Sequence, residues 1–100
     1  MIAEKEHNLD AETIAGIGLQ LTEIPLITET PNIARVYEYP HLKNVYVMES
    51  DLYGNPMPKD SCFLAFKGQH GLIGKPLKIE KLKHSSVEEI EKIVQDNNEG

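Results

Sequence analysis

A chain of 100 residues, of which 40% are hydrophobic and 26% are charged, has the size and composition of one ordinary globular domain rather than of a disordered or fibrous protein. No apolar run approaches the roughly 20 residues of a membrane-spanning helix, and the charged first ten residues lack the apolar centre of a signal peptide. The net charge of −6 argues against broad binding to nucleic acid or to anionic membranes. We therefore expect a cytoplasmic protein, in its own cell or in a host's.

The N-terminal quarter of the chain predicts a short helix and a short strand after a flexible tail at residues 1–8. Apolar residues recur at helical spacing after Asp10, which suits the N-cap position, and Gly18 ends this pattern. Alternation over residues 19–22 then predicts a strand. Pro25 would stop this strand because proline has no N–H to donate to a sheet.

The middle of the chain predicts three strands and a weaker fourth. Residues 33–39, 44–49 and 61–67 are rich in branched and aromatic side chains. The segment 61–67 is apolar at both odd and even positions, so we expect it to be central and covered on both faces. Residues 77–83 alternate more weakly and are rich in lysine, as an edge strand often is. The glycine-rich residues between these two strands are interpreted as a hairpin loop.

The C-terminal residues predict an amphipathic helix. Ser85 and Glu88 have the spacing of a capping box, in which each side chain satisfies the backbone N–H of the other residue. The apolar stripe that follows consists of Val87, Ile90, Ile93 and Val94. The sum is an α+β fold: a single small domain over residues 9–100, with a mainly antiparallel sheet of four or five strands between a short N-terminal helix and a C-terminal helix.

Catalytic chemistry has weak support in this sequence. Cys62 is the single cysteine, and its apolar neighbours favour a buried structural thiol. Under one strand register Cys62, His84 and Asp60 would meet at one edge of the sheet. A small enzyme that uses Cys62 and His84 is therefore our third hypothesis.

Phosphate and metal sites are also poorly supported. The glycines around Lys75 lack the spacing of a Walker loop, and Pro76 stands where that loop needs serine or threonine. Gly71 and Gly74 have the spacing of a KH-type clamp but lack its flanking helices. The four histidines are scattered at His7, His41, His70 and His84. We expect no metal and no cofactor.

Charge is distributed unevenly along the chain. Residues 52–83 contain six lysines and two acids, whereas the segments before and after them carry net charges of −6 and −4. A lysine-guarded edge strand explains most of this cluster. The alternative is a nucleic-acid or phosphorylated-ligand site, with Tyr37, Tyr39 or Tyr46 available for stacking, although the chain has a single arginine. The lysines concerned are Lys67, Lys75, Lys78, Lys81 and Lys83.

The connection at residues 50–60 has the features of a contact surface. It carries the apolar side chains of Leu52, Tyr53 and Met57 and is stiffened by two prolines. These side chains either bind a partner or cover the core. Our leading hypothesis is a non-catalytic interaction module that binds a macromolecule, most readily a protein, as an inhibitor or immunity-type protein does. We also expect a homodimer, because two helices leave part of a doubly apolar sheet uncovered.

Overall fold

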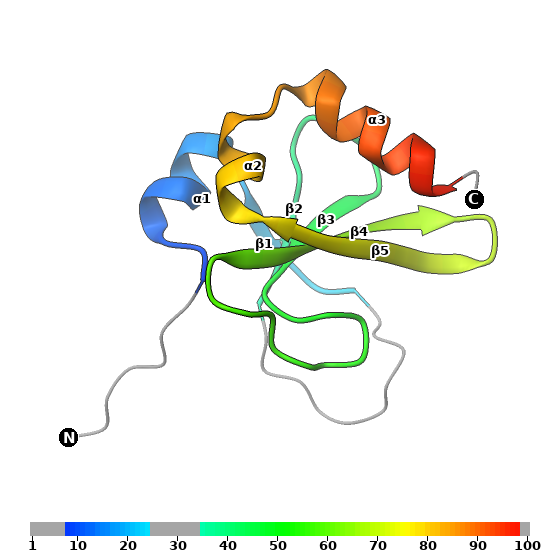
Figure 1. The fold of residues 1–100 in the computed structure, drawn as a ribbon, viewed down its shortest axis with the longest axis horizontal. Coiled ribbons are helices and arrows are strands. Elements are labelled where there is room, and N and C mark those ends of the chain that lie inside the picture. The colour runs from blue at the N-terminus through cyan, green and yellow to red at the C-terminus, as the bar shows by residue number, and fades with distance from the viewer. Residues whose placement is uncertain (1–7, 25–34, 99–100) are drawn as a thin grey trace.

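A five-stranded antiparallel sheet forms the centre of the protein, in a computed structural model that describes residues 8–24 and 35–98. The strands lie in chain order, each antiparallel to the next, and the three helices lie outside the sheet (Figure 1). The elements are α1 (Ala11–Ile17), β1 (Gln20–Thr22), β2 (Val36–Glu38), β3 (Val45–Met48), β4 (Ser61–Gly68), β5 (Gly71–Lys78), α2 (Ile79–His84) and α3 (Val87–Asn98). The predicted α+β class is confirmed. The predicted tail, apart from Asn8, and the start of the predicted strand 33–39 lie outside the described residues.

Helix α1 begins and ends as the sequence predicts. The Asp10 carboxylate accepts a hydrogen bond of 2.7 Å from the backbone N–H of Thr13, which is the N-cap contact. Gly18 follows the helix with φ at 85°, a left-handed conformation that glycine adopts without a steric penalty. Hydrogen bonds from the side chain and backbone of Thr13 are the main reason why the pKa of Asp10 lies below its ordinary value.

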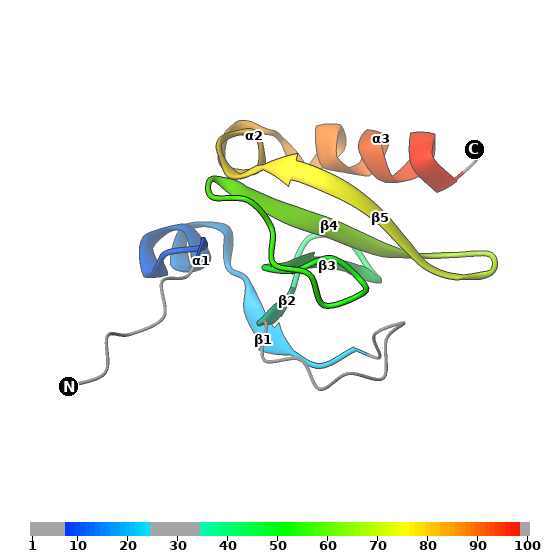
Figure 2. The same ribbon diagram turned by 60° about the horizontal axis from the view of Figure 1, so that its bottom comes forward.

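The sheet buries apolar side chains on both faces. Helices α2 and α3 lie over one face, and the loop between β3 and β4 lies under the other (Figure 2). The helix-side core contains Leu9, Leu19, Tyr37, Tyr39, Val45, Val47, Cys62, Leu64, Phe66, Leu77, Leu82 and Ile90. The loop-side core contains Val36, Tyr46, Met48, Leu52, Phe63 and Ala65.

Strand β4 has the environment that its sequence predicts. It lies between β3 and β5, and every residue from 61 to 66 is buried, including Leu64 and Phe66. Its even-numbered side chains enter the helix-side core, and Phe63 and Ala65 enter the loop-side core. The strand is therefore interior and covered on both faces, while β3 is the middle strand of the five.

The last hairpin differs from the prediction. Residues 68–76 do not form a long loop: a turn of two residues, Gln69 and His70, connects β4 directly to β5. Gly71, with φ at 123°, permits this early return. The predicted strand at 77–83 is wrong beyond Lys78, where the chain enters α2. The physical reason is the helical spacing of Ile79 and Leu82, which places Leu82 in the helix-side core.

The cap of α3 lies one residue later than predicted. The Ser86 N–H donates to Glu89 Oε1 at 2.8 Å, and the Glu89 N–H donates to Ser86 Oγ at 3.2 Å. These two reciprocal bonds form a capping box. Two serines, each followed three residues later by a glutamate, made both registers possible. Ser85 is instead the C-cap of α2, so the next residue becomes the N-cap of α3.

Candidate interaction surface

The 50–60 loop is held closed at its base by the backbone. Ser50 and Pro56 form an isolated antiparallel bridge. Beside it the Asp51 N–H donates to the Asn55 carbonyl at 2.9 Å, and the Met57 N–H donates to the Glu49 carbonyl at 3.2 Å. The connection therefore continues the antiparallel pairing of the sheet for a short distance and does not leave the domain as a free strand of chain.

One carboxylate organises the tip of this loop. Asp51 Oδ1 accepts from the backbone N–H groups of Tyr53 and Asn55, both at 2.9 Å, and Oδ2 accepts from the Asn55 side-chain amide at 3.2 Å. Gly54, with φ at 90°, donates its N–H to the Asp51 carbonyl at 3.1 Å. This pattern is an Asx turn that is closed by a second turn. It fixes the backbone on both sides of Tyr53.

The pKa of Asp51 reflects these bonds. Desolvation is the largest single influence and raises the pKa. The hydrogen bonds from Asn55, Tyr53 and Gly54 together outweigh desolvation, so the pKa lies below the ordinary value of 3.8. The carboxylate is therefore charged at neutral pH and keeps its role as an acceptor.

A residue before α1 secures the second half of the loop. The side-chain amide of Asn8 donates to the carbonyls of Ser61 at 2.8 Å and Pro58 at 3.0 Å, and more weakly to that of Met57 at 3.4 Å. The Ser61 N–H also donates to the Pro58 carbonyl at 3.0 Å. We predicted Asn8 as part of the flexible tail, but these contacts make it a structural part of the domain.

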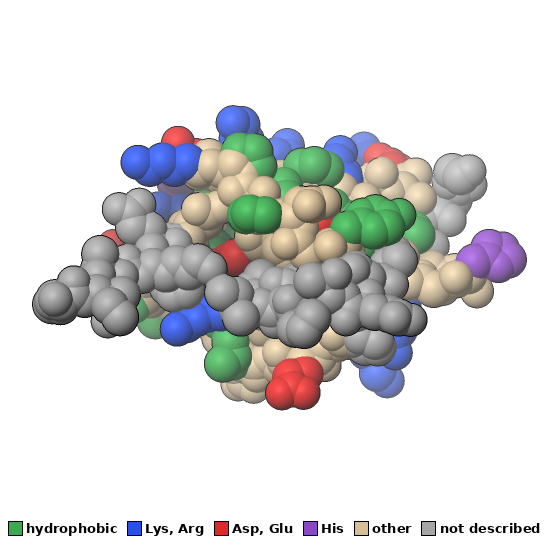
Figure 3. All heavy atoms as spheres, turned by 90° about the horizontal axis from the view of Figure 1, so that it is seen from below, with side chains coloured by type: hydrophobic (Ala, Val, Ile, Leu, Met, Phe, Trp, Pro, Cys, Tyr) green, Lys and Arg blue, Asp and Glu red, His purple; other side chains and the backbone are tan. Residues whose placement is uncertain are grey.

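The three apolar side chains that we singled out in this loop have different environments. Leu52 is 5% exposed and belongs to the loop-side core, and Met57 is half-buried against that core. Tyr53, in contrast, is 60% exposed. Viewed from below, the molecule shows several separate hydrophobic side chains on this side (Figure 3). Leu52 and Met57 therefore cover the core, whereas Tyr53 is exposed to solvent.

Our sequence analysis did not identify Asp51 and Asn55, whose hydrogen bonds fix the backbone around the exposed Tyr53. The signal was present, because aspartate, asparagine and glycine within five residues are typical of side-chain-stabilised turns. It also missed Leu21 in β1, which is 66% exposed. Leu21 and Tyr53 are the large hydrophobic side chains that stand out as exposed within the described part of the chain.

The lysine cluster spans several elements and both faces of the sheet. Lys67 lies on β4, Lys75 and Lys78 lie on β5, and Lys81 and Lys83 lie on α2. Register places Lys67 and Lys78 on the loop side and Lys75 on the helix side. The three tyrosines that we considered for base stacking are buried, and burial raises the pKa of one of them. They are Tyr37, Tyr39 and Tyr46, of which Tyr39 has the raised pKa.

The grouping of Cys62, His84 and Asp60 at one sheet edge is not formed. Cys62 pairs with Leu77 rather than with Leu82, has no exposed surface, and has its pKa raised to about 12 by burial. His84 lies in α2, where its Nε2 is 3.0 Å from Glu80 Oε1 and both side chains are exposed. A thiol of this kind carries almost no thiolate at neutral pH. The register hypothesis that grouped Cys62 with His84 and Asp60 is wrong because α2 replaces the end of the predicted strand.

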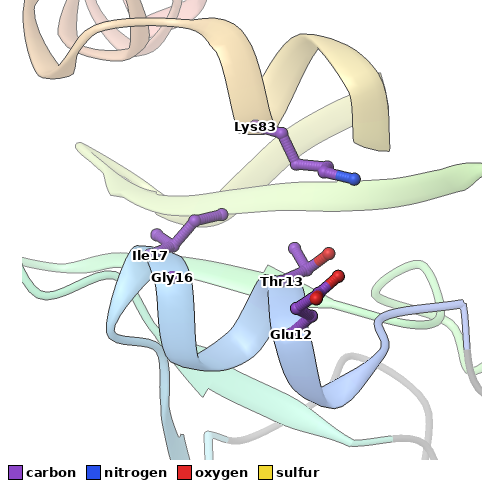
Figure 4. Close-up of a pocket in the computed structure, with 5 residues that line it drawn as sticks. All are labelled: Glu12, Thr13, Gly16, Ile17 and Lys83. Atoms are coloured by element: carbon purple, nitrogen blue, oxygen red, sulfur yellow. The ribbon is translucent and has the colours of Figure 1, made fainter.

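A hollow of about 230 Å³ lies between α1 and α2 (Figure 4). Lys83 of α2 lies on one side of it, and the other side is lined by four residues of α1: Glu12, Thr13, Gly16 and Ile17. The Thr13 side chain is already hydrogen-bonded to a neighbouring carboxylate. The charged ends of Glu12 and Lys83 are opposite in sign, so the hollow does not concentrate charge for a ligand. The hollow is therefore a gap in the packing between α1 and α2.

Three further features that the sequence disfavoured are also not found among the described residues: a phosphate-binding loop, a metal site and a membrane-spanning helix. Residues 71–78 form a strand, so neither a phosphate loop nor a KH-type clamp is built there. Across residues 8–24 and 35–98, no group of three His, Cys, Asp or Glu side chains could hold a metal ion. Within those same ranges, no helix is long and apolar enough to span a membrane.

Comparison with protein-family models, with curated proteins and with solved structures finds no match to this chain.

Proposed function

We propose that this protein is a non-catalytic interaction module, which binds a protein partner through the 50–60 loop with Tyr53 as the central contact. Its size and net charge suit an inhibitor or an immunity-type protein of the cytoplasm. The proposal assigns Leu52 and Met57 a supporting role, because they fasten the loop to the loop-side core.

The observation that supports this proposal is an exposed tyrosine on an ordered backbone. Tyr53 is 60% exposed, yet its own N–H and that of Asn55 are held by one carboxylate. Tyrosine is enriched among the residues that dominate binding energy at protein interfaces, because its ring contributes a large contact area with few rotatable bonds. A loop that is already ordered loses less conformational entropy when it binds.

The composition of the loop fits a protein partner better than a polyanion. Pro56 and Pro58 are exposed next to the half-buried Met57, so the surface around Tyr53 offers apolar contact area. Lys59 and Asp60, at the end of the loop, are exposed and opposite in sign. An apolar centre with a charged rim is typical of protein interfaces.

A nucleic-acid or phosphorylated ligand bound by the lysine cluster is the second candidate. The observation that favours it is the absence of acidic residues from positions 61–79, which contain three lysines. Against it, the cluster is divided between two faces of the sheet, and no tyrosine of β2 or β3 is exposed for stacking. The flanking segments also carry a combined charge of −10, which repels a polyanion.

Photo-crosslinking in the source cell tests the leading proposal. Tyr53 is replaced by the photo-reactive analogue benzoylphenylalanine, and Leu21 is replaced in the same way as a control of similar exposure on β1. We expect a specific crosslinked protein from position 53 and none from position 21. Crosslinks of equal strength from both positions, or from position 21 alone, would contradict the proposal.

A further inference from the structure

Strand β5 is a long edge of the sheet. It pairs with β4 over eight residues, and its other side has no strand partner within the described residues. An edge of this length presents a row of backbone donors and acceptors that can pair with another chain.

The pairing pattern identifies the outward-facing residues. The Lys67 N–H donates to the Asn44 carbonyl beside β3, so the odd-numbered residues of β4 pair with β3 and the even-numbered ones pair with β5. The even-numbered residues of β4 lie opposite the odd-numbered residues of β5. The even-numbered residues of β5 therefore direct their N–H and C=O groups away from the sheet. These residues are Leu72, Gly74, Pro76 and Lys78.

Only the second half of this edge is protected. Pro76 has no N–H, and Lys75 and Lys78 flank it with charge, which are the usual devices that prevent edge pairing. Residues 71–74 are two glycines and two aliphatic residues, with no charge and no proline. At Gly74 an added Cβ would lie 2.6 Å from the Phe63 ring, so this ring packs against the loop-side face of β5 at this position.

Among aspartate, glutamate, lysine and arginine, the β4–β5 hairpin carries lysine alone. The hairpin and its flanks, residues 61–79, contain no aspartate or glutamate. Lys67 lies opposite Leu72 and faces the loop side, whereas Lys75 faces the helix side. A strand added at residues 71–75 would lie directly beside Lys75 on the helix side, while Lys67 is set back by one strand on the loop side. A second copy of this chain, paired through its own β5, would bring its lysines toward these same lysines, so an acidic strand is favoured.

We propose that β5 accepts an extended acidic segment of a partner protein, which adds to the sheet as a sixth strand along residues 71–75. The Leu72 and Gly74 N–H groups donate to the added strand, and the carbonyls of Leu72, Gly74 and Pro76 accept from it. Carboxylates of the added strand pair with Lys67 and Lys75. This surface is separate from the Tyr53 loop, and it does not depend on the function proposed for that loop.

Amide hydrogen exchange by NMR tests the proposal with a defined probe. The probe is a blocked peptide in which glutamate alternates with valine, equal in length to the eight residues of β5. We expect exchange at Leu72 and Gly74 to slow about tenfold when the peptide is at roughly ten times its Kd. Ile73 and Lys75, whose N–H groups face β4, are already protected and serve as internal controls.

Two further peptides and two variants complete the test. A peptide with lysine in place of glutamate, and the glutamate peptide N-methylated throughout, should leave Leu72 and Gly74 unchanged. The double variant Lys67→Glu with Lys75→Glu should bind the lysine peptide in preference to the glutamate peptide. If this double variant does not fold, Lys67→Glu alone provides the test and should weaken binding of the glutamate peptide. No slowing with any peptide, or equal slowing with both charges, would overturn the proposal. Slowing that depends on protein concentration alone would also overturn it and identify a second copy as the occupant.

Discussion

The Asp51 carboxylate accepts three hydrogen bonds from two later residues of the turn, Tyr53 and Asn55. At the scale of single residues, this contact decides whether Tyr53 is displayed on an ordered backbone or on a mobile one. Its neighbour Leu52 is turned the other way into the loop-side core. The sequence indicated an apolar loop, but it could not tell which of these adjacent side chains points inward, because that depends on the turn.

The turn should be sensitive to acid in a defined range. Because hydrogen bonding lowers the pKa of Asp51 in the folded state, the carboxylate stabilises the fold above its ordinary pKa of 3.8. This contribution is lost as the pH falls through the lowered folded value. We expect the amide NMR signals of Tyr53 and Asn55 to be constant near neutral pH and to titrate with a midpoint below 3.8. Asp51→Asn should abolish this titration, and a midpoint above 3.8 would contradict the account.

The thiol of Cys62 should be inert in the native protein. It has no exposed surface, and burial raises its pKa to about 12, so both access and ionisation oppose reaction. We expect labelling by a thiol reagent to proceed only as fast as the protein opens, and to become fast in denaturant. Native-state labelling at the rate of a free peptide thiol would reopen the hypothesis of an enzyme based on Cys62.

At the scale of elements, the two serines before α3 provide a matched pair. Ser86 forms the capping box with Glu89, whereas Ser85 is the C-cap residue of α2. Ser86→Ala should lower the free energy of unfolding by about 1 kcal/mol, the usual effect of removing an N-cap hydroxyl. Ser85→Ala should have a much smaller effect in the same denaturant titrations. Equal effects, or a larger one at Ser85, would contradict the observed register.

Two glycines should respond to alanine in opposite directions. At Gly74 a Cβ would clash with the Leu64 carbonyl and lie 2.6 Å from the Phe63 ring, so Gly74→Ala should destabilise by about 1–3 kcal/mol. Gly16 lies in α1 with nothing within 4 Å of the added atom. Gly16→Ala should therefore stabilise by roughly 0.5–1 kcal/mol through helix propensity. Thermal unfolding of both variants measures the direction of each change in stability. A Gly74→Ala variant as stable as the parent protein would contradict the close packing at β5.

Hydrophobic pattern was enough to predict some elements and misleading for others. Segment 61–67 was identifiable because a strand apolar at every position must be covered on both faces. Strand β5 was not, because glycine and proline at positions 71–76 have low strand propensity, which long pairing with β4 overrides. Helix α2 was mistaken for the end of a strand because a six-residue helix is too short for its periodicity to be distinctive.

At the scale of the whole molecule, two small cores enclose one sheet. The helix-side core is covered by helices and the loop-side core in part by Leu52 and Met57. The homodimer expected from the sequence remains a prediction. Its original reason, an uncovered apolar face, is weaker, since the 50–60 loop covers part of that face. The candidate site was predicted to the level of this loop, and the choice of Tyr53 as the displayed side chain required the structure.

A binding titration of variants against the crosslinked partner, at two salt concentrations, distinguishes an interface centred on Tyr53 from one formed by the lysines. If Tyr53 anchors a protein partner, Tyr53→Ala should weaken binding by about 2 kcal/mol or more, roughly thirtyfold in Kd. Lys78→Ala combined with Lys81→Ala should then have little effect, and a fourfold increase in salt should change Kd only slightly. If the lysines bind a polyanion, that salt increase should reduce affinity by roughly 10²–10³. Loss of binding in the double lysine variant, with Tyr53→Ala unaffected, would contradict the account.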